Sequence, residues 1–122
     1  MRALIVDDSR FMRGLLRGLL EDKGIQCEEA ADGQAGIDLL HSSSPFDLAL
    51  LDWNMPVMNG LDMLVELRGE GYGDLKVMMV TTEAESEYIE RALDAGADEY
   101  LMKPFDEEAL TGKLAMMGLV EN

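Results

Sequence analysis

The chain has 122 residues, the usual size of a single domain, and is long enough to bury a hydrophobic core. Hydrophobic residues make up 48% of it and charged residues 29%, which is typical of soluble globular proteins, while 25 acidic against 10 basic residues give a formal net charge of −15. A surface this negative repels nucleic acid and anionic lipid, so we expect neither as a partner.

Short apolar runs alternate with amphipathic stretches along the whole chain. The first predicted strand covers 3–6, and a helix follows after the candidate N-cap Ser9 and is closed by Gly24. The remaining predicted elements are a more polar edge strand at 25–31, a helix after Asp32-Gly33 that ends near 41–45, a strand at 46–51, a helix at 60–68, a strand at 77–80, a helix from about residue 88 that Gly96 ends, a strand at 99–102, and a last helix that Asp106 caps.

This alternation of five strands with five helices indicates an α/β fold. Nearly all-apolar strands are typical of a parallel sheet with helices on both faces. Right-handed crossovers and the chain length favour a flavodoxin-like, doubly wound (βα)5 arrangement with strand order 2-1-3-4-5. No linker or internal repeat is visible, so we expect one domain over residues 1–122 without an output domain.

The rare residue types indicate a reducing environment. Cys27 is the only cysteine, so no internal disulfide can form, and we interpret it as a small core residue. The only histidine, His41, lies at a Ser-rich helix end, and we expect it to be exposed. No apolar run approaches the length of a membrane span, and the first residues are typical of a strand rather than a signal peptide, so we expect a cytoplasmic protein without a membrane partner.

Polar residues directly follow four of the predicted strands. Asp7-Asp8 ends the first strand, Asp52 the third, Thr81 the fourth and Lys103 the fifth. In a parallel sheet these ends lie along one edge, where the ligand sites of such folds are found. We therefore expect three carboxylates, a hydroxyl and an ammonium group to converge.

Three neighbouring carboxylates cannot all stay ionised without a counter-charge. Mg²⁺ supplies that charge and prefers oxygen ligands, with Mn²⁺ as the alternative ion. We predict a metal site made by the side chains of Asp7, Asp8 and Asp52 and completed by the backbone carbonyl of Asn54.

The same residues suit phosphoryl transfer. The Asp52 carboxylate would act as a nucleophile on phosphorus and form an acyl phosphate, while the metal shields the two negative groups from each other. Lys103 and Thr81 would each hold a phosphoryl oxygen, so that catalysis rests on positioning and electrostatics. We therefore predict that Asp52 is a phosphoryl acceptor.

Other phosphate sites and hydrolase chemistries fit the sequence less well. A flavin or nucleotide site would need an anion cradle after the first strand, where Asp7-Asp8 stands instead. Neither a G-x-x-x-x-G-K-[ST] nor a G-x-G-x-x-G motif is present. Serine or cysteine hydrolase chemistry lacks a base, because His41 is remote from the strand ends.

These residues resemble the receiver domain of two-component response regulators, most of all the CheY-like chemotaxis regulators that consist of a receiver alone. The resemblance covers the whole chain in order. It rests on Val6-Asp7-Asp8-Ser9, on the run from Asp52 to Gly60, on Thr81, on Ala95-Gly96-Ala97-Asp98, and on Tyr100-Leu101-Met102-Lys103-Pro104-Phe105.

The resemblance implies a phosphorylation switch. Asp52 would take a phosphoryl group from a phosphohistidine on a sensor histidine kinase or a histidine phosphotransfer protein. Lys103 would contact that group, helped by a cis bond to Pro104. Thr81 would move toward it, and Tyr100 would then swing inward and change the surface made by the fourth helix, the fifth strand and the fifth helix.

The resemblance also indicates how long the phosphoryl state lasts and where it is read. Asn54 and Glu83 occupy the two positions that tune hydrolysis in this family, and they imply a short lifetime. Thr82 departs from the family pattern, because the residue there is usually small.

The expected partners are the kinase, a phosphatase and a downstream protein such as a flagellar motor switch protein. The candidate docking surface for the downstream protein is an apolar patch made by Met102, Met116, Met117 and Leu119. The alternative is that these side chains are buried in the core.

Two alternatives remain open at this point. The chain could be a phosphorelay intermediate or phosphate sink that passes its phosphoryl group to another histidine protein. It could also be an enzyme that uses Asp52 covalently, as phosphatases of the haloacid dehalogenase type do, but these need an acid where Asn54 stands. We expect a signalling switch rather than an enzyme, one that catalyses only its own phosphorylation and dephosphorylation.

Overall fold

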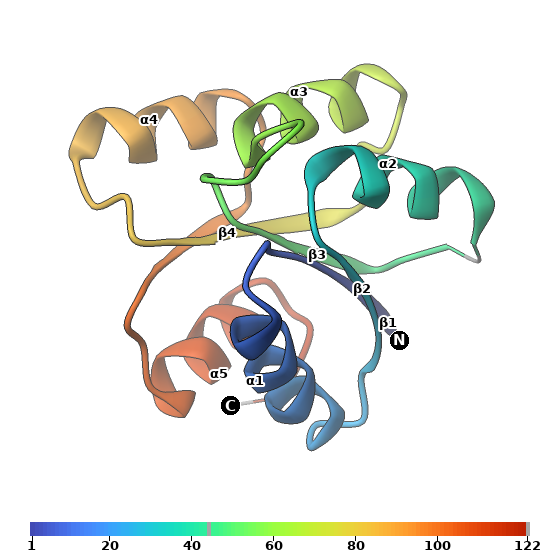
Figure 1. Ribbon diagram of the computed structural model, residues 1–122. Helices are drawn as coiled ribbons and strands as arrows, with labels where there is room; N and C mark the ends of the chain where they lie inside the picture. The colour runs from blue at the N-terminus through green and yellow to red at the C-terminus, as the bar shows by residue number, and fades with distance from the viewer. Residues whose placement is uncertain (44, 122) are drawn as a thin grey trace.

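We describe a computed structural model of the chain, covering residues 1–43 and 45–121. Five strands alternate with five helices (Figure 1). The strands are β1 Arg2–Val6, β2 Gln26–Ala30, β3 Leu48–Leu51, β4 Lys76–Thr81 and β5 Glu99–Met102. The helices are α1 Arg10–Glu21, α2 Gly33–Ser42, α3 Gly60–Gly69, α4 Ser86–Asp94 and α5 Glu107–Met116. Within the described residues, no helix is long and apolar enough to cross a membrane.

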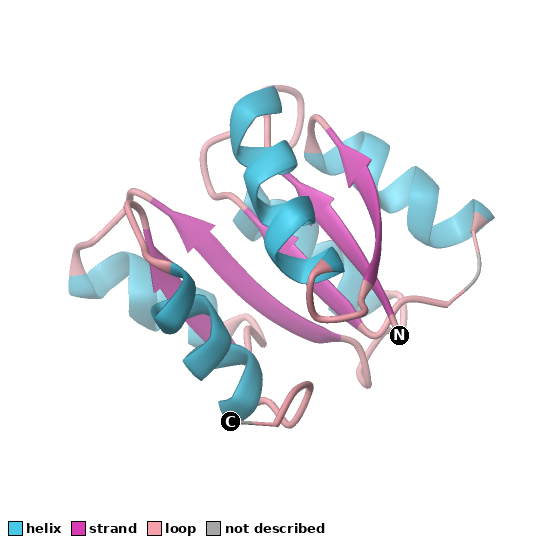
Figure 2. Ribbon diagram, turned by 90° about the horizontal axis from the view of Figure 1, so that it is seen from below, coloured by secondary structure: helices cyan, strands magenta, loops and turns pink. Residues whose placement is uncertain are grey.

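All five strands are parallel and form one sheet in the order β2-β1-β3-β4-β5, which confirms the predicted flavodoxin-like topology. Figure 2 shows the strand arrows running in a common direction. The order makes β1 and β3 neighbours, with Val6 beside Leu51. The carboxyl ends of these two strands, and hence Asp7 and Asp52, therefore lie side by side.

The sheet separates two hydrophobic cores, because side chains alternate between its faces along each strand. Val6 and Leu51 point toward α2, α3 and α4, whereas Ile5 and Leu50 point toward α1 and α5. Figure 1 shows these two layers of helices above and below the sheet. Both faces are buried, which explains why the central strands are apolar without alternation.

The helix starts follow the capping residues. Four of the five N-caps use a side-chain oxygen to accept a backbone N–H three residues later, at 2.8–3.2 Å; they are Ser9, Asp32, Asn59 and Asp106. The Ser9 and Asp106 caps confirm the sequence prediction. These caps fix where each chain segment turns from the sheet edge into its helix.

The predicted strand and helix boundaries differ from the observed ones by one or two residues. The strand predicted at 46–51 begins only at Leu48, and the Phe46 ring before it lies under the Arg2 guanidinium, 4.4 Å away. Gly24 closes the first helix as predicted: α1 ends at Glu21, and Gly24 follows with a φ of +81° and donates its N–H to the Glu21 carbonyl at 2.9 Å. A positive φ at this position favours glycine and turns the chain into β2.

The only cysteine and the only histidine of the sequence lie where the sequence predicts. Cys27 is buried in the core between the sheet and α1, and burial raises the pKa of its thiol to about 11. His41 is exposed at the end of α2 and lies 2.7 Å from the Glu70 carboxylate. Neither residue is near the carboxyl edge of the sheet.

Candidate functional site

Three carboxylates converge at the carboxyl edge of the sheet, as the strand ends predict. Each of Asp7, Asp8 and Asp52 offers an oxygen that lies within 4.8 Å of an oxygen of the other two. Asp7 is 2% exposed and Asp52 is 8% exposed, whereas Asp8 lies at the surface. The cluster is therefore a partly buried acidic site that opens to solvent on the Asp8 side.

Lys103 joins two of these acids. Its ammonium group lies 2.7 Å from Asp7 Oδ2 and 3.1 Å from Asp52 Oδ2. Burial lowers the pKa of Lys103, but hydrogen bonds and attraction from the two carboxylates outweigh that effect, so its pKa is raised. The Lys103–Pro104 peptide bond is cis, as the sequence predicts. Lys103 therefore remains charged at the centre of the site.

Thr81 and Tyr100 meet at the backbone of Glu83. Thr81 is fully buried, and its hydroxyl accepts the Glu83 N–H at 3.3 Å. The Tyr100 hydroxyl donates to the Glu83 carbonyl at 2.6 Å, and the Tyr100 side chain points inward, with the residue 8% exposed. Burial and the nearby Glu83 carboxylate raise the pKa of Tyr100 to about 12. The movement of these side chains on phosphorylation stays a prediction.

Asn54 and Glu83 contact each other across the site. The Asn54 side-chain amide donates to Glu83 Oε1 at 2.7 Å, which links the β3–α3 connection to the β4–α4 connection. The sequence indicated both positions but not this hydrogen bond between them. Thr82 beside Glu83 is exposed, so its branched side chain lies on the outside of the β4–α4 connection.

Trp53 ties the acidic site to α4. It directly follows Asp52 and is buried, and its ring meets that of Tyr88 edge to face with centroids 4.9 Å apart. The Arg91 guanidinium lies 5.5 Å from the Trp53 ring centroid. Packing at Trp53 therefore connects the residue after Asp52 with two residues of α4.

The β3–α3 connection has two backbone features that the sequence analysis did not interpret. A Cβ atom on Gly60 would lie 2.1 Å from the Asp52 carbonyl oxygen, so only glycine fits there. Val57 has a φ of +68°, which is strained for a β-branched residue, and Met58 N–H donates to the Pro56 carbonyl at 2.7 Å around it. The signals for both were the Pro56 and Gly60 chain breakers that follow Asp52.

The acidic cluster fits a hard divalent cation. It supplies only carboxylate oxygens, one side is open for water or a phosphoryl group, and Mg²⁺ is bound by such incomplete oxygen sites. One ammonium group against three carboxylates leaves negative charge in excess, which a cation would neutralise. The residues of the site therefore suit Mg²⁺.

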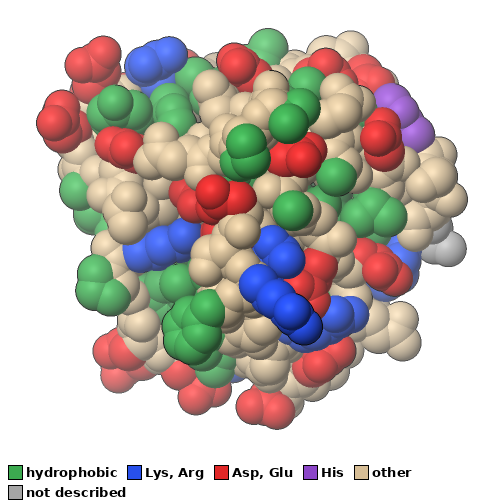
Figure 3. Space-filling model, in the orientation of Figure 1, with side chains coloured by type: hydrophobic (Ala, Val, Ile, Leu, Met, Phe, Trp, Pro, Cys, Tyr) green, Lys and Arg blue, Asp and Glu red, His purple; other side chains and the backbone are tan. Residues whose placement is uncertain are grey.

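Charge is unevenly distributed on the face that Figure 3 shows. Acidic side chains are spread widely over it, whereas Lys and Arg side chains gather below the middle, over α1. This helix carries Arg10, Arg13 and Arg17 but only one acid, Glu21. The basic helix therefore begins in the chain shortly after the acidic residues Asp7 and Asp8.

The apolar patch predicted for docking is only partly present. Met102 is exposed, and Met116 is 71% exposed. Met117 and Leu119 instead pack against the core between the sheet, α1 and α5, so burial is the better interpretation for them. The exposed part of the patch thus consists of two methionines on β5 and α5.

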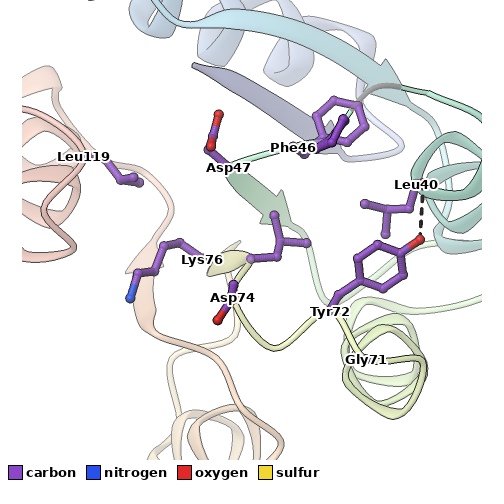
Figure 4. Close-up of a pocket in the computed structure, with 10 residues that line it drawn as sticks. Leu40, Phe46, Asp47, Gly71, Tyr72, Asp74, Lys76 and Leu119 are labelled. Carbon is purple, nitrogen blue, oxygen red and sulfur yellow. Dashed lines mark hydrogen bonds between the residues drawn. The ribbon is translucent and has the colours of Figure 1, made fainter.

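A cleft of about 420 Å³ lies at the opposite edge of the sheet, between the connections that precede β3 and β4 (Figure 4). Phe46, Tyr72 and Leu119 line it, and the Tyr72 hydroxyl donates to the Leu40 carbonyl at 3.3 Å. None of the predicted metal-binding, phosphoryl-transfer or switch residues belongs to this cleft. The acidic cluster is therefore the functional site that the sequence and the fold indicate together.

Comparisons with known proteins assign the chain to a family. Residues 3–115 match the response regulator receiver domain family. The chain is 42% identical over 116 residues to the chemotaxis protein CheY of Pseudomonas aeruginosa, and the match covers 93% of both chains. It is 41% identical over 116 residues to the chemotaxis protein CheY-3 of Vibrio cholerae, which covers 93% of this chain and 88% of that protein.

Solved structures show the same architecture. The chemotaxis protein CheY4 of Vibrio cholerae superposes with a TM-score of 0.88 at 34% identity, covering 94% of this chain and 96% of that one. A CheY-like receiver domain protein from Methanospirillum hungatei superposes with a TM-score of 0.86 at 34% identity, covering 95% of this chain and 91% of that one. The chain therefore belongs to the response regulator receiver domain family, as a CheY-like protein of two-component signalling.

Proposed function

We propose that the chain is a switch in which Asp52 accepts a phosphoryl group from a phosphohistidine. The observation that carries the proposal is the Lys103 ammonium group, bound to Asp7 and Asp52 inside a cluster of three carboxylates. An ion pair that served stability alone would not require two further acids beside it. A phosphoryl group arriving at Asp52 would find a cation already in place.

The transfer exchanges one bond to phosphorus for another. An Asp52 oxygen forms a P–O bond while the P–N bond to the donor histidine breaks, and the histidine keeps the electron pair. Lys103 turns from the Asp52 oxygen to a phosphoryl oxygen, and the Thr81 hydroxyl donates to another. Thr81 ends β4, the neighbour of β3, and Lys103 follows β5, so both groups lie at the same edge of the sheet as Asp52.

Asp7, Asp8 and Asp52 would hold Mg²⁺ together with the Asn54 backbone carbonyl. When bound, the ion supplies positive charge that offsets the repulsion between Asp52 and the phosphoryl group. Asp7 accepts the Ser9 N–H at 2.8 Å and binds Lys103 with its other oxygen, so it would act on the ion largely through water. Asp8 is exposed and has no such partner among the described residues, so it is the acid able to bind directly.

The phosphoryl state ends when water attacks phosphorus and the P–O bond to Asp52 breaks. Asn54 and Glu83 lie at the mouth of the site and hold each other at 2.7 Å. An amide and a carboxylate in this position can orient a water molecule for that attack, which gives a short lifetime.

The state of Asp52 would be read on the surface of α4, β5 and α5. Tyr100 contacts the Glu83 backbone, and Trp53 contacts Tyr88 and Arg91, so the β4–α4 connection and α4 both touch residues of the site. Because the similar relatives are chemotaxis proteins, the proposed downstream partner is a flagellar motor switch protein and the proposed donor a chemotaxis histidine kinase or a phosphotransfer protein. A phosphatase is a further proposed partner.

The mass of the intact protein tests the chemistry. The protein is incubated with acetyl phosphate and Mg²⁺, with an Asp52→Asn variant and a metal-free sample alongside. A base-labile phosphoryl adduct that needs both Asp52 and Mg²⁺ is expected. A fold without phosphorylation chemistry would give no adduct and would also fail to bind beryllofluoride.

The affinity for a motor switch protein tests the output. Binding that strengthens with beryllofluoride supports the switch. Unchanged affinity, together with transfer of the phosphoryl group to a second histidine protein, would identify a relay intermediate or phosphate sink instead. Turnover of small phosphomonoesters would identify a phosphatase.

A further inference from the structure

Arg13 reaches back from the first turn of α1 to the acidic site. Its Nη1 atom donates to the backbone carbonyl of Asp7 at 2.6 Å, and its Nε atom lies 3.1 Å from Glu29 Oε1. The Arg13 side chain is 16% exposed, which is unusually low for arginine on a helix that faces solvent. The sequence places Arg13 among the polar residues of an amphipathic helix and gives no sign of these contacts.

The carbonyl that Arg13 binds is the one between the two adjacent acids. Asp7 N–H still belongs to the sheet and donates to the Ala30 carbonyl, but β2 ends at Ala30. No backbone N–H of the described residues donates to the Asp7 carbonyl. Arg13 provides the donor at the point where the sheet ladder stops.

This contact bears on how Asp7 and Asp8 face the same site. Successive side chains of an extended chain point to opposite sides, so two adjacent carboxylates share one site only if the peptide between them is turned. Arg13 holds the oxygen of that peptide at 2.6 Å, and the Ser9 N–H holds Asp7 Oδ1 at 2.8 Å. The turn is therefore fixed on both sides of Asp8.

Glu29 fixes Arg13 in turn. One Glu29 oxygen binds Arg13, and the other binds Arg17 Nη1 at 2.5 Å. Arg17 also donates to the Cys27 carbonyl and pairs with Glu21, and neither contact involves the acids of the site. Arg13 and Arg17 thus share the partner Glu29, but only Arg13 touches the loop that carries the acids.

We propose that Arg13 is a positioning residue for the metal site, which holds the Asp7–Asp8 peptide so that both carboxylates face one ion. The proposal rests on the metal site of the proposed function. Groups that orient the ligands of a metal typically change its affinity by 10–100-fold when they are removed.

Positioning and simple electrostatics predict opposite effects. The Arg13 guanidinium is a positive charge near the site, so removing it would strengthen the binding of a cation if charge alone mattered. If Arg13 positions the loop, removing it weakens binding, because Asp8 is no longer held toward Asp7 and Asp52. The sign of the change therefore decides between the two.

The test compares Arg13→Met with Arg17→Met. Methionine is a good helix former of similar length and has no donor, so both variants keep α1 and lose one partner of Glu29. Titration calorimetry with Mg²⁺ and Mn²⁺ measures the dissociation constant of each protein. We expect a rise of about tenfold for Arg13→Met and less than twofold for Arg17→Met.

A second measurement separates positioning from loss of fold. Urea denaturation without metal should show a similar loss of unfolding free energy in both variants, since each loses one partner of Glu29. At saturating Mg²⁺ the rate of phosphorylation by acetyl phosphate should return close to that of the wild type in Arg13→Met. An unchanged or lower dissociation constant for Mg²⁺ in Arg13→Met overturns the proposal. So does a dissociation constant that rises equally in Arg13→Met and Arg17→Met. If the wild type itself binds no Mg²⁺, the metal site of the proposed function fails instead.

Discussion

Replacing Asp8 by Asn should stabilise the protein without metal and destabilise it relative to the wild type with metal. Asp8 is exposed, and its carboxylate is close to those of Asp7 and Asp52, whereas Lys103 binds only the latter two. In the absence of a cation, Asp8 therefore contributes repulsion. In its presence, the same carboxylate becomes a ligand.

The distances give the size of the effect. At 4.8 Å, the upper limit of the oxygen separations in the cluster, two unit charges repel by about 0.9 kcal/mol in water and by about 3.5 kcal/mol at the dielectric constant of a protein surface. The solvent-exposed position of Asp8 makes the lower value the better one, so two such pairs cost about 2 kcal/mol. Attraction to Lys103 offsets about half of this, which leaves a gain of about 1 kcal/mol for Asp8→Asn.

Urea denaturation of both proteins in EDTA and in about 10 mM Mg²⁺ measures the two effects, since a ligand that binds only the folded state stabilises it. The advantage of Asp8→Asn in EDTA should shrink as salt is added. A variant less stable than the wild type in EDTA would refute the repulsion. Equal stabilisation of both proteins by Mg²⁺ would refute the role of Asp8 as a ligand.

Three further predictions concern single positions. Gly60→Ala places a Cβ 2.1 Å from the Asp52 carbonyl oxygen and should destabilise the protein by about 2 kcal/mol or more. Gly14→Ala has open space around it in α1 and should stabilise the protein by about 0.5–1 kcal/mol. Urea denaturation of the two variants tests these opposite signs. Val57→Asn should raise the free energy of unfolding by about 1 kcal/mol, because asparagine tolerates the positive φ and little contact is lost at a residue that is 83% exposed; an unchanged denaturation midpoint would contradict the strain. The pKa of Tyr100 is raised to about 12 in the folded state, so its contribution to stability is complete below the ordinary pKa of about 10 and is lost as pH rises toward 12. In a pH titration of the near-ultraviolet tyrosinate absorbance, the wild type should show a transition at about pH 12 that is missing in Tyr100→Phe.

The arrangement of the site follows from the sequence because it depends on strand ends. Asp7, Asp52, Thr81 and Lys103 each follow an apolar run, and a parallel sheet brings the carboxyl ends of such runs to one edge. The topology needed only the alternation of strands with helices and the handedness of their connections. The position of a strand end depends on the backbone pattern and not on any side-chain conformation.

Contacts between side chains from different elements could not be predicted in the same way. Arg13 is one of three arginines on α1, and which of them meets the Asp7 carbonyl depends on how α1 packs against the sheet. The Asn54–Glu83 hydrogen bond depends on the distance between two connections that share no pattern in the sequence. Met117 could not be assigned to the core or the surface, because it lies at the end of α5, where periodicity no longer applies.

The position of Trp53 gives the protein an optical reporter of its own. It is the only tryptophan in the chain, it directly follows Asp52, and its ring lies against Tyr88 and under the charge of Arg91. Indole emission responds to the field of a nearby cation, so a shift of α4 relative to the ring changes the colour of the fluorescence. An unlabelled sample should therefore show by its emission spectrum both when the site is occupied and when α4 moves.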